Sequence, residues 1–420
     1  MPTRPSEVFL SRLNAAADSD VTVLLRCTTV ARADAVLEAL IRAGTTAPVR
    51  EVGNRARRLE VVRRLPAVLG PHTLDHSPGS AGPWDLARAS DDPTVVVVRW
   101  SHLAGDARTC QEAVLDGLQH AGLLGADADR GCQCVRLPAG AQGPASPADA
   151  WGALRAQGES GVWDALRAAL PATTPLLRPL RTALDTGAPT ANTTDAAQAT
   201  DAVALIAMDD VTTGHAPHHP PASRFAHVVS AVAAMSGQRR IGVTVDLRRH
   251  EPTLPGAGTA GNLSLVGWIV LPRRRPAPEP THQRVQGLLR RRFWRQQLAV
   301  DAWLGDRSPE RLADRCDLLI GGLAHRAPTT VTELWRDDGP VCAGCGRARR
   351  HLPPDIGVLA IPPALPPAGL TVGITRTAAH TTVSLRRVTL PGHSATAWLT
   401  TAAARWARGR TLHAGPVTHP

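Results

Sequence analysis

The sequence predicts an α/β protein built from two halves. In its first third, β-rich runs alternate with segments whose apolar residues recur at helical spacing. Between Pro171 and Thr200 the composition shifts to Pro, Thr, Ala and Asp with little periodicity, which predicts a crossover. Strand and helix patterns then restart, and a chain of 420 residues has room for two domains of ordinary size. We therefore expect an N-terminal half at 1–175, a linker at 176–200 and a C-terminal half at 201–420.

The elements of the first half follow from local patterns. A β-rich run at 21–27 predicts a strand, and apolar residues at helical spacing from Ala33 to Ala43 predict a helix that stops at Gly44. Extended segments are expected near 49–52 and 59–62. The β-branched block 95–98 is typical of a strand buried on both faces, and an amphipathic helix is expected after Asp106.

The second half predicts the same kinds of element. Alternating apolar residues predict strands, a hairpin is expected near the end, and Ser394 is expected to cap a final helix. The expected strands are 202–207, 241–247, 263–271, 370–374 and 382–385, and the expected longer helices are 225–235 and 283–303.

Composition excludes several classes. The net charge is +11, but the chain has no Lys and no Tyr and is rich in Arg, Ala, Gly and Pro, which indicates a GC-rich coding sequence. Only 3 Phe residues leave few stacking platforms for single strands, so nucleic-acid binding is disfavoured. No stretch reaches the roughly 18 apolar residues of a membrane span. With no apolar signal core and 7 irregularly spaced cysteines, we expect a cytoplasmic protein.

One short segment carries chemistry. The β-branched block leads into Ser101-His102-Leu103-Ala104-Gly105-Asp106-Ala107, a His-x-x-x-Asp motif between a strand and a helix. This segment resembles the His-His-x-x-x-Asp-Gly signature of the condensation-domain and chloramphenicol-acetyltransferase superfamily. Further matches occur in the family's order: Val245-Asp-Leu-Arg248, then Gly261-Asn262, then the late hairpin.

The resemblance implies two acyltransferase-like halves that form a V with a tunnel between them. It implies transfer of an acyl or aminoacyl group from a thioester to an amine or hydroxyl of a small-molecule acceptor, in bacterial specialised metabolism. No bound cofactor is expected. The donor would be an acyl-pantetheine, on coenzyme A or on an acyl or peptidyl carrier protein.

The resemblance also assigns roles to residues. His102 would be the general base, a task that suits an imidazole near neutral pH. Asp106 would pair with Arg248 to support the motif, Ser101 takes the place of the first His, and Asn262 would support its strand or bind a carbonyl oxygen. Read without the family, His102 is a structural histidine and Asp106 a helix N-cap.

Other readings stay open. With Ser101 and Ala107 replacing the family's His and Gly, the chain could instead be a non-catalytic scaffold or carrier-protein-binding partner. Cys342 and Cys345 are ordinary loop cysteines or, with His351, zinc ligands, and no metal site is predicted. The histidine-rich segment 214–219 is read as a surface loop. Arginines at 273–275, 290–292 and 295 form a solvated surface or bind an acidic partner.

Overall fold

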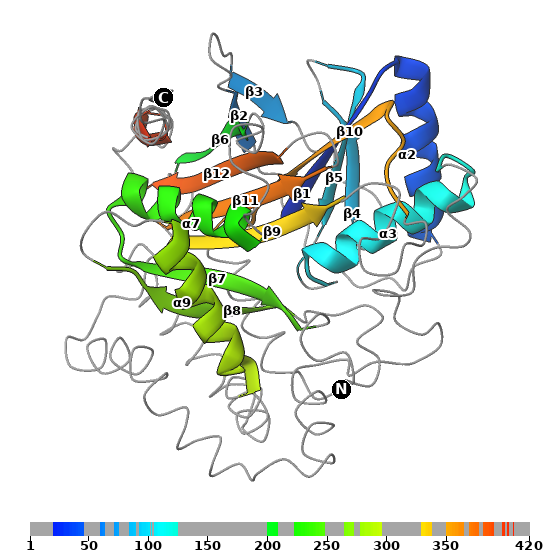
Figure 1. The fold of residues 1–420 in the computed structure, drawn as a ribbon. Helices are drawn as coiled ribbons and strands as arrows, with labels where there is room; N and C mark the ends of the chain where they lie inside the picture. The colour runs from blue at the N-terminus through cyan, green and yellow to red at the C-terminus, as the bar shows by residue number, and fades with distance from the viewer. Residues whose placement is uncertain are drawn as a thin grey trace, which may run out of the picture.

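The protein was analysed as a computed structural model, shown in Figure 1. The structure describes residues 20–45, 59–63, 71–74, 84–89, 92–100, 102, 105–124, 200–208, 222–247, 264–272, 278–295, 329–337, 350–364, 369–377, 381–389, 397–399, 401–402 and 406.

Within these residues, four strands form the smaller of two sheets, in the order β10-β1-β5-β4 with antiparallel pairs throughout. They span Ile356–Ile361, Val21–Cys27, Val95–Trp100 and Trp84–Arg88, respectively. Every residue of β5 from Val96 to Trp100 is buried. The β-branched block of the sequence therefore forms a central strand, as expected.

Two helices, α2 (Val30–Thr45) and α3 (Ala107–His120), cover one face of this sheet (Figure 1). Because side chains alternate along a strand, Val96, Val98 and Trp100 pack with the helices, whereas Val97 faces the opposite way and packs with Val203 of the other sheet. The smaller sheet thus has a helix-covered face and a face that packs against the larger sheet.

The larger sheet has the order β3-β2-β6-β12-β11-β9-β7-β8. The pairs β2–β6, β9–β11 and β7–β9 are parallel, and the others are antiparallel, including the predicted β11–β12 hairpin. In the order of the sheet the strands span Pro71–Leu74, Leu59–Arg63, Thr200–Met208, Thr381–Thr389, Leu370–Arg376, Thr329–Arg336, Arg240–Asp246 and Ser264–Val270.

Helices α7 (Ala222–Ser236) and α9 (Pro278–Arg290) pack on one face of the larger sheet (Figure 1). They contact each other through buried apolar residues and one polar pair, in which Ser230 Oγ donates to Thr281 Oγ1 at 2.7 Å. Both residues are buried, so the Ser230 hydroxyl donates to Thr281 Oγ1 rather than to solvent.

Each sheet contains strands from both the early and the late part of the chain, and hydrogen bonds join the two sheets. β10 comes late in the chain but pairs with β1, and β2 comes early but pairs with β6. β10 is an edge strand, and its Ala360 N–H donates to Thr375 Oγ1 at 2.8 Å while its carbonyl accepts from Ser384 Oγ at 2.8 Å. Two side chains of the larger sheet therefore bind the backbone N–H and carbonyl of Ala360 at the outer edge of the smaller sheet. These bonds join the two sheets into one body.

The predicted helix at 283–303 was wrong in its bounds. It begins earlier, at Pro278, and breaks after Arg290, where Arg292 takes a left-handed φ of 47°. Residues 293–295 are helical again, and 296–303 lie outside the described residues. The turn at Arg292 allows the consecutive Phe293 and Trp294 both to be buried, with their rings in an edge-to-face contact at 5.5 Å. Residues 176–199 of the predicted linker and the Ser394 cap lie outside the described residues, whereas Thr200 begins β6.

Candidate active site

His102 lies in the turn between β5 and α3, where its ring is partly buried. Its Nδ1 is 3.2 Å from the carbonyl oxygen of Gly105, which also accepts a hydrogen bond from Trp100 Nε1 at 2.9 Å. A carbonyl oxygen can only accept, so this contact places the proton of a neutral ring on Nδ1. In that tautomer the lone pair of the ring is on Nε2.

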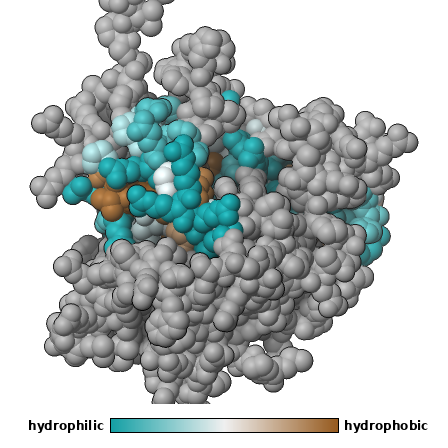
Figure 2. All heavy atoms as spheres, turned by 60° about the horizontal axis from the view of Figure 1, so that its bottom comes forward, coloured by the Kyte–Doolittle hydropathy of each residue, from teal (hydrophilic) through white to brown (hydrophobic). Residues whose placement is uncertain are grey.

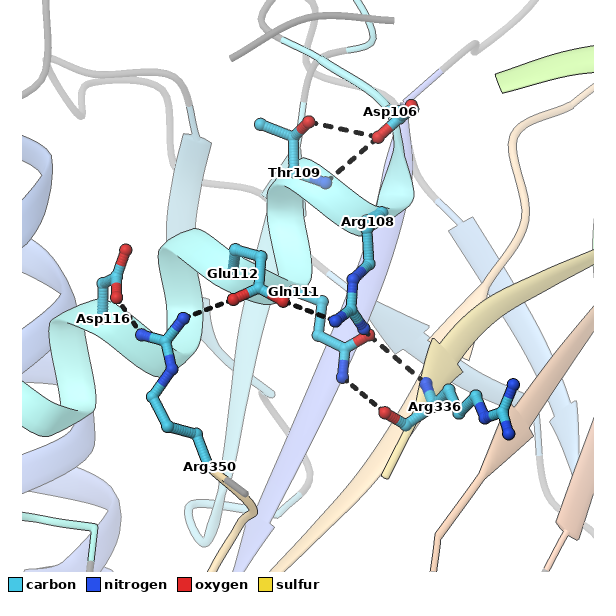
Figure 3. A network of polar contacts seen from close by, with 8 residues as sticks. All are labelled: Asp106, Arg108, Thr109, Gln111, Glu112, Asp116, Arg336 and Arg350. Atoms are coloured by element: carbon cyan, nitrogen blue, oxygen red, sulfur yellow. Dashed lines mark hydrogen bonds and ion pairs between the residues drawn. The ribbon is translucent and has the colours of Figure 1, made fainter. Parts of the chain in front are cut away.

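Asp106 is the N-cap of α3. It is 2% exposed, and its Oδ1 accepts hydrogen bonds from Thr109 N at 3.0 Å and Thr109 Oγ1 at 3.1 Å (Figure 3). The cap satisfies a backbone N–H that has no partner within the helix. The interpretation of Asp106 as an N-cap is confirmed.

Asp106 also bonds to the second half of the chain. Ser264 Oγ, at the first residue of β8, donates to Asp106 Oδ2 at 3.0 Å. The motif of the first half therefore lies beside the start of β8, two residues after Asn262. Ser101, Arg248 and Asn262 themselves lie outside the described residues, so the Asp106–Arg248 pair stays a prediction.

The two small residues of the motif have distinct tasks. A Cβ built on Gly105 would lie 2.8 Å from Cβ of Thr109, too close for the cap to keep its geometry. Ala107 stands where the family has Gly, but here it is the first residue of α3 and has no positive φ. Its Cβ is therefore compatible with this turn.

A polar network continues along α3 (Figure 3). Gln111 Nε2 donates to the carbonyl of Arg336 at 2.7 Å, and Arg336 N donates back to Gln111 Oε1 at 3.3 Å. One turn further on, Arg350 forms ion pairs with Glu112 and Asp116. Sequence reasoning missed Gln111 and Ser264, because one amide or one hydroxyl carries no local signal for a partner that is remote in the chain.

The cysteine nearest the motif is not a candidate nucleophile. Cys110 is fully buried, and burial, together with the negative charge of Asp106, raises the pKa of its thiol. Burial also raises the pKa of Cys27, at the far end of β1. A thiol with a raised pKa is protonated near neutral pH and is a poor nucleophile.

Within the described part of the chain, no group of three or more His, Cys, Asp or Glu side chains is arranged to hold a metal ion. Cys342, Cys345 and the histidine-rich segment 214–219 are not part of that description. Among the helices that the structure describes, none is long and apolar enough to cross a membrane.

The arginines at the end of α9 are on the surface. Arg284, Arg290, Arg291 and Arg292 are exposed, whereas Arg295 is partly buried. Figure 2 brings the lower side of Figure 1 forward and shows the described residues of this face as mainly hydrophilic around small hydrophobic areas. The other predicted arginines, at 273–275, lie beyond the described segments.

No family model and no curated protein sequence matches the chain. Comparison with solved structures finds the condensation enzyme VibH at a TM-score of 0.44 and 9% identity, covering 98% of this chain and 97% of VibH. SgcC5 from Streptomyces globisporus matches at 0.43 and 13%, covering 97% and 99% of the two chains. The starter condensation domain of rhizomide synthetase RzmA matches at 0.39 and 15%, covering 99% and 96%. Each of these alignments covers 97% or more of this chain, at a low sequence identity.

Proposed function

We propose that the protein is a condensation-type acyltransferase in which His102 is the general base. The observation that supports the proposal is the 3.2 Å contact between His102 Nδ1 and the Gly105 carbonyl oxygen, which favours the tautomer whose lone pair is on Nε2. A histidine held by a fixed acceptor on one nitrogen, with the other nitrogen basic, is the arrangement that general base catalysis requires. The resemblance of residues 101–107 to the acyltransferase signature supplies the reaction class.

The reaction would proceed in two steps. Nε2 takes the proton of the acceptor's amine or hydroxyl group as that group attacks the thioester carbonyl carbon. The tetrahedral intermediate then breaks its carbon–sulfur bond, and the imidazolium returns the proton to the departing thiolate. The products are an amide or ester and a free thiol, and His102 ends in its starting state.

Both substrates would meet between the halves. The bond between Asp106 and Ser264 supports this position, because it joins the His102 turn to the larger sheet. In this proposal the halves form a V, and the donor and the acceptor enter a tunnel from opposite sides. Asn262, two residues before Ser264, would bind a carbonyl oxygen or support β8, and Arg248 would pair with Asp106.

The donor would carry a pantetheine arm on coenzyme A or on a carrier protein. The exposed arginines Arg284 and Arg290 of α9, and Arg291 and Arg292 just after it, suit the phosphate and acidic groups that accompany this arm. Nucleic acid would bind such a surface without sequence preference and with a steep dependence on salt. Charge reversal at Arg290 and Arg291 should weaken binding of an acyl carrier protein at physiological salt. Tight DNA or RNA binding at that salt would contradict this assignment.

The test of the function is a panel of acyl-pantetheine thioesters offered with amine and alcohol acceptors. Thiol release that depends on the acceptor, with an amide or ester identified by mass spectrometry, is the expected result. A wild-type protein that binds a carrier protein but turns over no thioester in the panel would contradict the enzyme proposal and favour a scaffold.

A further inference from the structure

The side chain of Gln111 completes the edge of a strand. β7 pairs with β9 only at Thr329–Val331, so the β9 backbone at Arg336 extends beyond its partner on that side. The amide of Gln111 meets it there, donating to the Arg336 carbonyl at 2.7 Å and accepting from the Arg336 N–H at 3.3 Å. Arg108 Nη1 donates to the same Gln111 Oε1 at 2.8 Å, which fixes the orientation of the amide (Figure 3).

This position is buried, since Gln111 is 3% exposed and the preceding Cys110 is fully buried. An apolar side chain of similar size would fill the same space. The amide provides what an apolar group cannot, a donor for the Arg336 carbonyl and an acceptor for the Arg336 N–H.

With this contact, α3 is attached to the larger sheet at two places. Asp106 binds Ser264 on β8, and Gln111 binds Arg336 on β9, with β7 between those two strands. A helix held at one point can pivot about that point, whereas attachments to two strands fix its direction as well. The first turn of α3 is directly joined to Gly105, whose carbonyl holds the His102 ring.

We propose that Gln111 is a positioning residue for His102: its amide fixes the first turns of α3 on β9 and so holds the base at a constant place relative to the larger sheet. The inference rests on the proposed function. A displacement of about 1 Å in a catalytic group can lower a rate roughly 100-fold, so a loss of this attachment should lower kcat more than it raises KM.

The test compares Gln111→Met and Gln111→Glu with Gln283→Met. Methionine keeps the shape but removes both bonds. Glutamate keeps the acceptor but places an oxygen against the Arg336 carbonyl. Gln283→Met removes one exposed hydrogen bond, to Glu279 on α9, and is the matched control. Both Gln111 variants should lose about tenfold or more in kcat with KM within about threefold, while the control keeps wild-type values.

If Gln111 only filled space, methionine, which keeps its shape, would leave kcat unchanged. A folded Gln111→Met protein with wild-type kcat would therefore overturn the proposal. Hydrogen exchange without substrate separates this from failure of the proposed function. The amides of Thr109 and Cys110 should exchange about tenfold faster or more in both variants, with those of α9 unchanged. Unchanged exchange at Thr109 and Cys110 would also overturn the proposal, whatever reaction the protein performs.

Discussion

Ser264 Oγ donates a hydrogen bond to Asp106 Oδ2 at 3.0 Å, joining the first residue of β8 to the N-cap of α3. The two residues are 158 positions apart. Asp106 therefore has two tasks in one carboxylate, since Oδ1 closes the helix and Oδ2 connects the two sheets. The Asp106 side chain therefore attaches the end of the His102 turn both to the first turn of α3 and to the start of β8.

Asp106→Ala should destabilise the protein more than Ser264→Ala. Asp106→Ala removes the helix cap and the hydrogen bond with Ser264, at a cost of about 1–3 kcal/mol. Ser264→Ala removes only the hydrogen bond with Asp106. Urea unfolding of both variants measures the difference. Equal stability of Asp106→Ala and the wild type, with full activity, would contradict a structural role for Asp106.

Gly105→Ala should disturb the cap directly. Its new Cβ would meet Thr109 Cβ at 2.8 Å, and the backbone there has little freedom because the Gly105 carbonyl accepts from both Trp100 and His102. We expect a loss of about 1–3 kcal/mol and reduced turnover. Gly287→Ala is the control, because a Cβ at that position on α9 meets nothing within 4 Å. It should be neutral or stabilising by up to about 1 kcal/mol, as thermal unfolding would show. Comparable losses in the two variants would argue against the steric explanation.

Thr375→Val should lower the stability of the protein, because it removes a hydrogen bond at the edge strand β10. Valine keeps the volume but leaves the buried Ala360 N–H without its partner, at a cost of about 1–3 kcal/mol. Thr381→Val, on β12 and only partly buried, is the matched substitution. Denaturant midpoints should fall for Thr375→Val alone. A midpoint unchanged at Thr375 would mean that the edge of β10 does not depend on this hydroxyl.

Cys110 and Cys27 should resist alkylation in the folded protein. Burial raises the pKa of both thiols, so at pH 8 each has a smaller thiolate fraction than a free cysteine, and only the thiolate reacts. Peptide mapping after iodoacetamide treatment, with and without denaturant, measures this. Rapid modification of Cys110 before unfolding would show that the interior of α3 is accessible.

Much of the fold could be predicted from local pattern. The β-branched run at 95–98 became the central strand β5, and alternation at 241–247 became β7. The sheets to which strands belong could not be predicted, because pairing of β10 with β1 joins residues more than three hundred positions apart without any local signal. Periodicity also missed the break after Arg290, since the burial of Phe293 and Trp294 together is a tertiary effect.

The same division applies to the site. The sequence pointed to His102 and Asp106 because a strand, a fixed spacing and a helix start coincide in seven residues. The cap role of Asp106 followed from its place before a helical pattern. Ser264 and Gln111 contribute through contacts with a carboxylate and a backbone that are remote in the sequence. A single hydroxyl or amide residue gives no sequence pattern from which such a contact could be predicted.

The proposed acyl transfer depends most on His102, and replacement of this residue tests the proposal most directly. His102→Ala should lower acyl transfer by about two to four orders of magnitude while the unfolding midpoint stays near that of the wild type. His120→Ala removes another histidine, exposed at the end of α3, and should keep full activity. Turnover lost in His102→Ala and kept in His120→Ala is the predicted result. Wild-type turnover in a folded His102→Ala protein would contradict its role as the base.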